Sequence, residues 1–159
     1  MLMKHLSLIR YVMLSLFVLN SSVVFPDILI SKLDDVSLST NANVGRDLII
    51  TEQLCIASNP VSVYGITALG SGDNGEFVIT NGPYEMEYKM SYRDRRSRGG
   101  FTDLTPGVPV SGFLARPLRN NRACQGNAGR LRIIIEKNSL NRAVAGLYRG
   151  VIQLSVVPE

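Results

Sequence analysis

Side chains able to carry out acid-base or nucleophilic chemistry are scarce in this sequence. The only histidine, His5, stands beside the N-terminus, so the rest of the chain can form no Ser-His or Cys-His pair and no histidine-based zinc site. Glu85 and Glu87 could form a carboxylate pair of the kind that hydrolyses glycosides. Both alternate with apolar residues, however, as the wet side of an amphipathic strand does. We therefore expect no catalytic residue, no metal ligand and no cofactor. We also expect that the protein is not an enzyme.

The two cysteines, Cys55 and Cys124, are the other reactive side chains. In an oxidising compartment a disulfide is the usual state of such a pair. A bond between them would close a long loop and stabilise the fold by about 4 kcal/mol in the chain-entropy model. No residue pattern supports a catalytic or metal-binding thiol. We expect one structural disulfide, Cys55 to Cys124.

The oxidising compartment is itself an expectation that comes from the first 22 residues. Lys4 and Arg10 supply a positive start, residues 11–19 are mostly apolar, and residues 20–22 are small and polar. This order is typical of a secretory signal peptide, and the apolar run is shorter than the roughly 20 residues that span a membrane. An uncleaved membrane anchor is the alternative. We expect a signal peptide over 1–22, cleaved between Ser21 and Pro26, and no membrane association afterwards.

The charge of the mature chain is modest. Without Lys4 and Arg10, 15 of the 17 basic residues remain against 13 acidic ones. Arginines gather in 93–98 and 116–122, where they could face an anionic surface, although a solvated loop is the favoured interpretation. The chain has no Trp and no aromatic platform among these arginines. Nucleic acid is therefore not an expected partner.

The elements that would position any site are predicted to be β-strands. Beyond Pro26 the apolar residues recur with period two in short runs bounded by Gly, Pro, Asn, Asp and Ser. Turn-forming residues at 70–75 and 81–83 indicate hairpins, and 139–145 is the one helical candidate, with Ser139 as its cap. The expected strands are 28–31, 36–38, 48–50, 54–57, 62–68, 76–79, 85–92, 108–114, 130–136 and 148–157. Such a series predicts one all-β sandwich domain over 27–159.

The order of several short motifs carries a family resemblance. The ending, residues 145–157, has the pattern Ala-Gly-x-Tyr-x-Gly-x-Ile-x-Leu-x-Val, and it follows weaker motifs at 33–35, 64–72, 104–107 and 131–135. This order resembles the subunits of bacterial chaperone–usher fimbriae. The resemblance is strongest to the colonisation-factor pilins and to the archaic Csu or spore-coat-U-type domains, and it covers most of 27–159.

The resemblance implies an immunoglobulin-like sandwich that lacks its last strand and is completed by β-strand addition from another subunit. On this basis, the segment Ile28, Leu29 and Ile30 is the expected donor strand. The implied partners are a periplasmic pilus chaperone, an outer-membrane usher and neighbouring pilus subunits. The implied route is through the periplasm to a surface fimbria that supports adhesion or biofilm formation. The acceptor groove would be lined by Leu131, Ile133, Ile135, Ile152, Leu154 and Val156.

Two questions stay open at this point. A self-sufficient periplasmic or secreted β-sandwich that binds an unknown partner is the alternative function. In addition, few residues separate Pro26 from Leu33, whereas a polymerising donor is usually longer. The sequence thus leaves undecided whether the chain is a major, minor or tip subunit.

Overall fold

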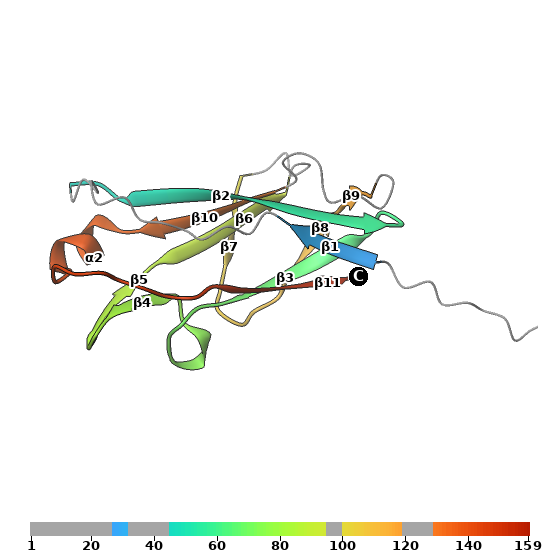
Figure 1. The fold of residues 1–159 in the computed structure, drawn as a ribbon. Helices are drawn as coiled ribbons and strands as arrows, with labels where there is room; N and C mark the ends of the chain where they lie inside the picture. The colour runs from blue at the N-terminus through green and yellow to red at the C-terminus, as the bar shows by residue number, and fades with distance from the viewer. Residues whose placement is uncertain (1–26, 32–44, 95–99, 119–128) are drawn as a thin grey trace, which may run out of the picture.

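The computed structural model describes residues 27–31, 45–94, 100–118 and 129–159. The predicted signal peptide and the predicted strand at 36–38 lie outside these residues. Within them the chain folds into two facing layers of β-strands, with one short helix at an end (Figure 1). The expectation of an all-β sandwich is confirmed.

The first layer is a largely antiparallel sheet built around a long strand. Its order is β1 (Asp27–Ser31), β2 (Leu48–Asn59), β10 (Gly129–Ile135), β6 (Lys89–Asp94) and β7 (Thr102–Leu104), with β9 (Arg116–Pro117) parallel to the end of β2. Ile133 of β10 stands opposite Ile50 of β2 and Met90 of β6. Such directly opposed residues point to one face of a sheet, so this row faces the core.

The second layer is smaller. It contains β11 (Gln153–Pro158), β3 (Val63–Leu69) and β8 (Val110–Leu114) in that order, all antiparallel. Beside it lies the hairpin of β4 (Val78–Asn81) and β5 (Tyr84–Glu87). Two short helical elements complete the described chain, η1 (Asp73–Gly75) and α2 (Lys137–Arg142). The C-terminal segment runs along the whole length of this layer (Figure 1).

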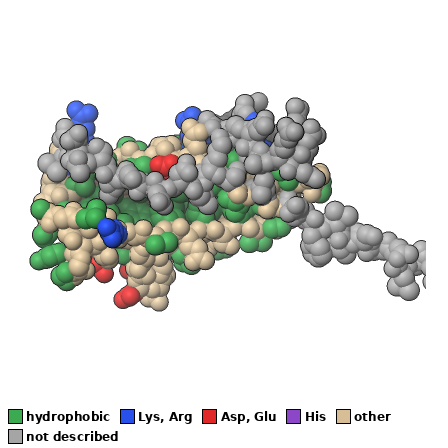
Figure 2. All heavy atoms as spheres, viewed as in Figure 1, with side chains coloured by type: hydrophobic (Ala, Val, Ile, Leu, Met, Phe, Trp, Pro, Cys, Tyr) green, Lys and Arg blue, Asp and Glu red, His purple; other side chains and the backbone are tan. Residues whose placement is uncertain are grey.

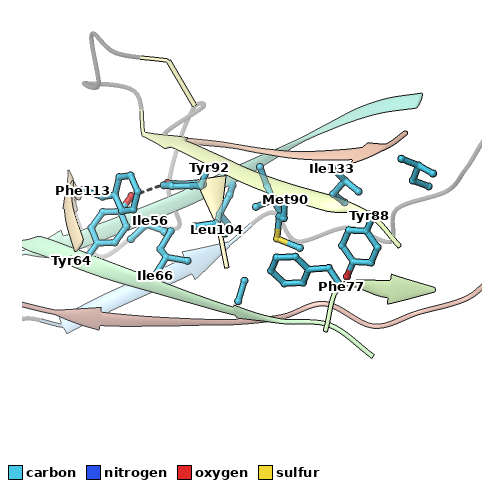
Figure 3. Packing of buried hydrophobic residues seen from close by; sticks show 14 of the residues in the cluster. Ile56, Tyr64, Ile66, Phe77, Tyr88, Met90, Tyr92, Leu104, Phe113 and Ile133 are labelled. Carbon is cyan, nitrogen blue, oxygen red and sulfur yellow. Dashed lines mark hydrogen bonds between the residues drawn. The ribbon is translucent and has the colours of Figure 1, made fainter. Parts of the chain in front are cut away.

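The core between the layers is rich in aromatic rings (Figure 3). At one end the hydroxyl groups of Tyr64 and Tyr92 are 2.8 Å apart, and Phe113 packs edge-on to Tyr92 with 4.9 Å between ring centroids. At the other end Phe77 stacks on Tyr88 with 5.5 Å between centroids. Burial raises the pKa of Tyr92 to about 12, so its hydroxyl stays protonated and can share in the hydrogen bond.

Several predicted element boundaries differ from the structure. The separate strands expected at 48–50 and 54–57 form one continuous strand, β2, while 85–92 divides at Tyr88 into β5 and β6. Gly82, with a φ of 59°, makes the β4–β5 hairpin as predicted. The segment 70–75 is not a hairpin, because β3 and β4 belong to different sheets. The helix begins at Lys137, after Glu136 rather than Ser139.

Candidate functional site

The C-terminal segment is hydrogen-bonded along one of its two edges. The backbone N–H of Arg149 donates to the carbonyl of Thr80 at 2.9 Å, and the N–H of Thr80 donates back at 2.8 Å. Two residues further on, the backbone of Val151 is hydrogen-bonded by a side chain rather than by a neighbouring strand. Ser71 Oγ accepts from the N–H of Val151 and donates to its carbonyl at 3.2 Å. From Gln153 onward β11 pairs with β3. One edge is thus bonded from Arg149 to the C-terminus.

The other edge of this segment has no strand beside it among the described residues. All the bonds above come from odd-numbered residues, and the last of them runs from the N–H of Glu159 to the carbonyl of Val63. In an antiparallel strand, successive residues direct their N–H and C=O groups to opposite edges. The backbone groups of Ile152, Leu154 and Val156 therefore point away from β3.

Side chains of the same three residues turn toward the core. Ile152, Leu154 and Val156 are half-buried and pack against the core cluster, whereas Val151 is 72% exposed and Val157 is 58% exposed. Ile152 and the β11 residues Leu154 and Val156 thus offer half-buried apolar side chains, and no strand among the described residues pairs with their outward backbone groups. This combination is the template that an added β-strand uses.

The first layer has a matching edge. β1 pairs with β2 only as far as Ser31, which lies opposite Cys55. Residues 48–54 of β2 pair with β10 on one side, and no described strand lies on their other side. Half-buried apolar side chains also follow this edge: Ile28, Ile30, Leu48 and Ile50. We call the strip between this edge and β11 the seam, and Figure 2 shows hydrophobic atoms along a recessed band between the layers on this face.

Residues predicted to line an acceptor groove divide into two groups. Leu131, Ile133 and Ile135 lie in β10, at the centre of the first sheet, and are buried. Leu154 and Val156 lie in β11, with Ile152 just before it, at the edge of the second sheet that no other described strand covers. All six belong to one core cluster. Three are thus at the surface of the seam and three lie within the core, and their role as acceptor stays a prediction.

The predicted donor segment occupies a place in the chain's own fold. Ile28, Leu29 and Ile30 form the middle of β1, opposite Ser58, Ala57 and Ile56 of β2. In this arrangement they extend the first sheet of the same molecule. A donor role toward another subunit stays a prediction, and it would require β1 to leave this position.

Only one cysteine of the expected disulfide, Cys55, lies among the described residues. Cys55 is fully buried in β2 and packs with Ala57 and Leu118. Cys124 lies outside the described residues, so the bond stays a prediction.

One charged residue near the seam was missed in the sequence. Glu52 stands in β2 between Ile50 and Leu54, in the alternation that places side chains on the core face. The polar residues Thr51, Glu52 and Gln53 lie between the predicted strands 48–50 and 54–57. The signal that could have found it is the period of two, which continues unbroken from Leu48 to Ile56 when Glu52 is counted as an inward position.

No group of His, Cys, Asp and Glu able to hold a metal ion occurs among the residues that the structure describes. In the same residues, no helix is long and apolar enough to cross a membrane. The expectation of a non-enzymatic protein stays a prediction.

Comparisons with known proteins agree with this architecture. The sequence matches no family model and no curated protein. Among solved structures, a chain from the chaperone–tip adhesin complex of CFA/I fimbriae has a similar fold, with a TM-score of 0.55 and 18% sequence identity. The match covers 84% of the present chain but only 42% of that chain. The fold is thus an immunoglobulin-like sandwich similar to one found in a fimbrial complex.

Proposed function

We propose that this chain is a structural or assembly subunit of a surface fimbria whose seam is filled by an extended strand from a partner. The observation that carries the proposal is the outer edge of β11 and of the residue before it, where the backbone groups of Ile152, Leu154 and Val156 have no partner among the described residues. An unpaired edge beside an apolar strip promotes aggregation unless something covers it. A donor strand would cover both at once.

The apolar side chains indicate how strongly a strand could bind. Full burial of an aliphatic side chain contributes about 1.5–3 kcal/mol, so completing the burial of a half-buried one contributes roughly half of that. The seam has seven such side chains, counting both edges: Ile28, Ile30, Leu48, Ile50, Ile152, Leu154 and Val156. Together they favour a stable complex rather than a transient contact.

The partners in this proposal are a periplasmic chaperone and neighbouring pilus subunits, with an usher at the outer membrane. The similarity to a chain of a chaperone–tip adhesin complex supports the first two. The basic and then apolar N-terminus supports export to the periplasm and then to the cell surface, where the fimbria would serve adhesion or biofilm formation. In this role the protein has no enzymatic activity.

A self-sufficient exported binding module is the second candidate. The observation that favours it is the position of β1, because residues 28–30 extend the chain's own sheet and are not held ready for another subunit. A subunit at the end of a fibre would share this feature. The two candidates differ in whether the seam needs an occupant for stability.

Thermal unfolding of the mature, oxidised protein separates these candidates. The probe is a twelve-residue peptide of alternating valine and threonine, with a scrambled peptide of the same composition as its control. At a hundredfold excess over its dissociation constant the alternating peptide should stabilise the protein by about 2.7 kcal/mol, which raises the midpoint by roughly 10 °C. A second peptide, copied from residues 27–38, tests the predicted donor segment.

Two variants of β11 localise the effect. Leu154→Lys places a charge on the core side of the seam and should abolish the response, while Val157→Lys changes an exposed residue of the same strand and should keep it. A monomer that is stable alone and indifferent to both peptides would contradict the fimbrial proposal and support the self-sufficient module.

A further inference from the structure

Glu52 lies on the core-facing side of the first sheet. Its strand register places it directly opposite Leu131, which is only 4% exposed. Directly opposed residues in neighbouring strands point to the same face. Along β2 itself, Glu52 follows Ile50 and precedes Leu54, and all three alternate with the exposed Ile49, Thr51 and Gln53.

The carboxylate of Glu52 has no charged or hydrogen-bonding partner among the described residues. The ion pair described there joins Lys89 to Glu136, and neither its atoms nor any side-chain hydrogen bond involves Glu52. Its nearest positions on the same face hold Ile50, Leu54 and Leu131. A half-buried carboxylate in such surroundings is unfavourable when a further apolar surface covers it, because it loses water and gains no partner.

The stretch of β2 that holds Glu52 is also the stretch that borders the seam. β1 stops at Ser31, opposite Cys55, and no described strand lies beside residues 48–54 on that edge. A strand that enters the seam between β11 and β2 would pass alongside Glu52. Its inward side chains would alternate with outward ones, and one inward side chain would come to lie next to the carboxylate.

From this geometry we infer that Glu52 selects its partner, and that the strand which fills the seam carries Lys or Arg at the inward position beside Glu52. This inference rests on the proposed function for the existence of an entering strand. A wholly apolar strand would bury the carboxylate unpaired, whereas a basic side chain would pair with it where water is partly excluded. Glu52 thus favours binding of a strand with a basic inward side chain and disfavours binding of a wholly apolar strand.

The same pair would fix the register of the strand. A shift by one residue turns the basic side chain to the wrong face, and a shift by two moves it about 7 Å along the seam. Apolar side chains alone discriminate poorly between such registers. A single charged pair therefore supplies the specificity that the aliphatic residues of the seam lack.

The test is a peptide series measured against three proteins. The parent is the alternating valine and threonine peptide, and lysine is placed at each inward position in turn, with norleucine at the same position as the uncharged control. The proteins are the wild type, Glu52→Gln, and the matched control Gln53→Glu, which adds a carboxylate on the outer face of the same strand. Affinity is measured by fluorescence anisotropy of labelled peptides at low and high salt.

We expect one lysine position to bind the wild type at least about tenfold more tightly than its norleucine counterpart, with the preference falling at high salt. The preference should drop to about twofold or less in Glu52→Gln and persist in Gln53→Glu. A further variant, Glu52→Leu, should favour norleucine instead.

The outcomes separate this inference from the function on which it rests. If the peptides bind but lysine gives no advantage, or if the advantage survives in Glu52→Gln, charge selection by Glu52 is wrong while the seam remains a strand acceptor. If no peptide binds the wild type, the proposed function fails, and the inference fails with it.

Discussion

Tyr64 and Tyr92 bury their hydroxyl groups against each other between the two layers, at one end of the core. Both side chains are almost fully inaccessible, and the 2.8 Å contact joins a strand of each layer. Desolvation by burial raises the pKa of both phenols, so the pair remains protonated well beyond physiological pH. This hydrogen bond therefore ties the two layers together.

Replacing Tyr64 by Phe should lower the free energy of unfolding by about 1–2 kcal/mol. The change removes one partner and leaves the buried hydroxyl of Tyr92 unsatisfied. Urea unfolding measures the loss, and Tyr84→Phe, at a side chain that is 48% exposed, is the control that should change little. A double variant that also carries Tyr92→Phe should recover part of the loss. Equal stabilities of Tyr64→Phe and the wild type would show that the hydroxyl pair does not contribute.

At the scale of elements, the sequence predicted strands best where one face is apolar and the other polar. β3 and β10 lie within a residue or two of their expected ranges because their alternation reflects a real difference between core and solvent. The predicted strands 48–50 and 54–57 are parts of one strand, β2, because β10 pairs with it across the polar residues 51–53. Local pattern cannot reveal such pairing, which depends on a strand far away in the sequence.

The role of the turn after β3 also could not be predicted from the sequence. Residues 70–75 have the composition of a hairpin, but they carry the chain from one sheet to another. There the N–H of Gly70 donates to the carbonyl of Gly75 at 2.7 Å, and a side-chain carbon added at Gly70 would collide with the backbone of Glu76. This turn also presents Ser71 to Val151.

Gly70→Ala should destabilise the protein by about 2 kcal/mol, because the added methyl group meets the backbone of Glu76 and the turn must open. The shift in chemical denaturation midpoint measures this. Gly100→Ala is the matched control, since no atom of the described residues lies within 4 Å of its added carbon. If both variants were equally stable, the turn would be more adaptable than its packing indicates.

At the scale of the whole molecule, the candidate site could be predicted only in part. The resemblance implies Ile152, Leu154 and Val156 in the last strand as groove-lining residues. It could not tell which edge of that strand is paired, because this depends on contacts with Thr80, Ser71 and β3. The sequence also could not show that residues 28–30 pair within the first sheet. An apolar strand can serve equally well in the chain's own sheet or as a donor to another subunit.

In the proposed function, the outer edge of β11 is open in the isolated protein and is closed by a partner strand. Amide hydrogen exchange followed by NMR measures the protection of each backbone N–H along this edge. The N–H groups of Gln153, Ser155 and Val157 face β3 and should be protected, whereas those of Ile152, Leu154 and Val156 should exchange rapidly.

Adding the alternating valine and threonine peptide should then protect the even-numbered amides and leave the odd-numbered ones unchanged. We predict this pattern, in which alternate amides first exchange fast and slowly and the fast ones are then selectively protected. Equal protection of odd and even amides in the peptide-free protein would contradict it, because the edge would already be paired.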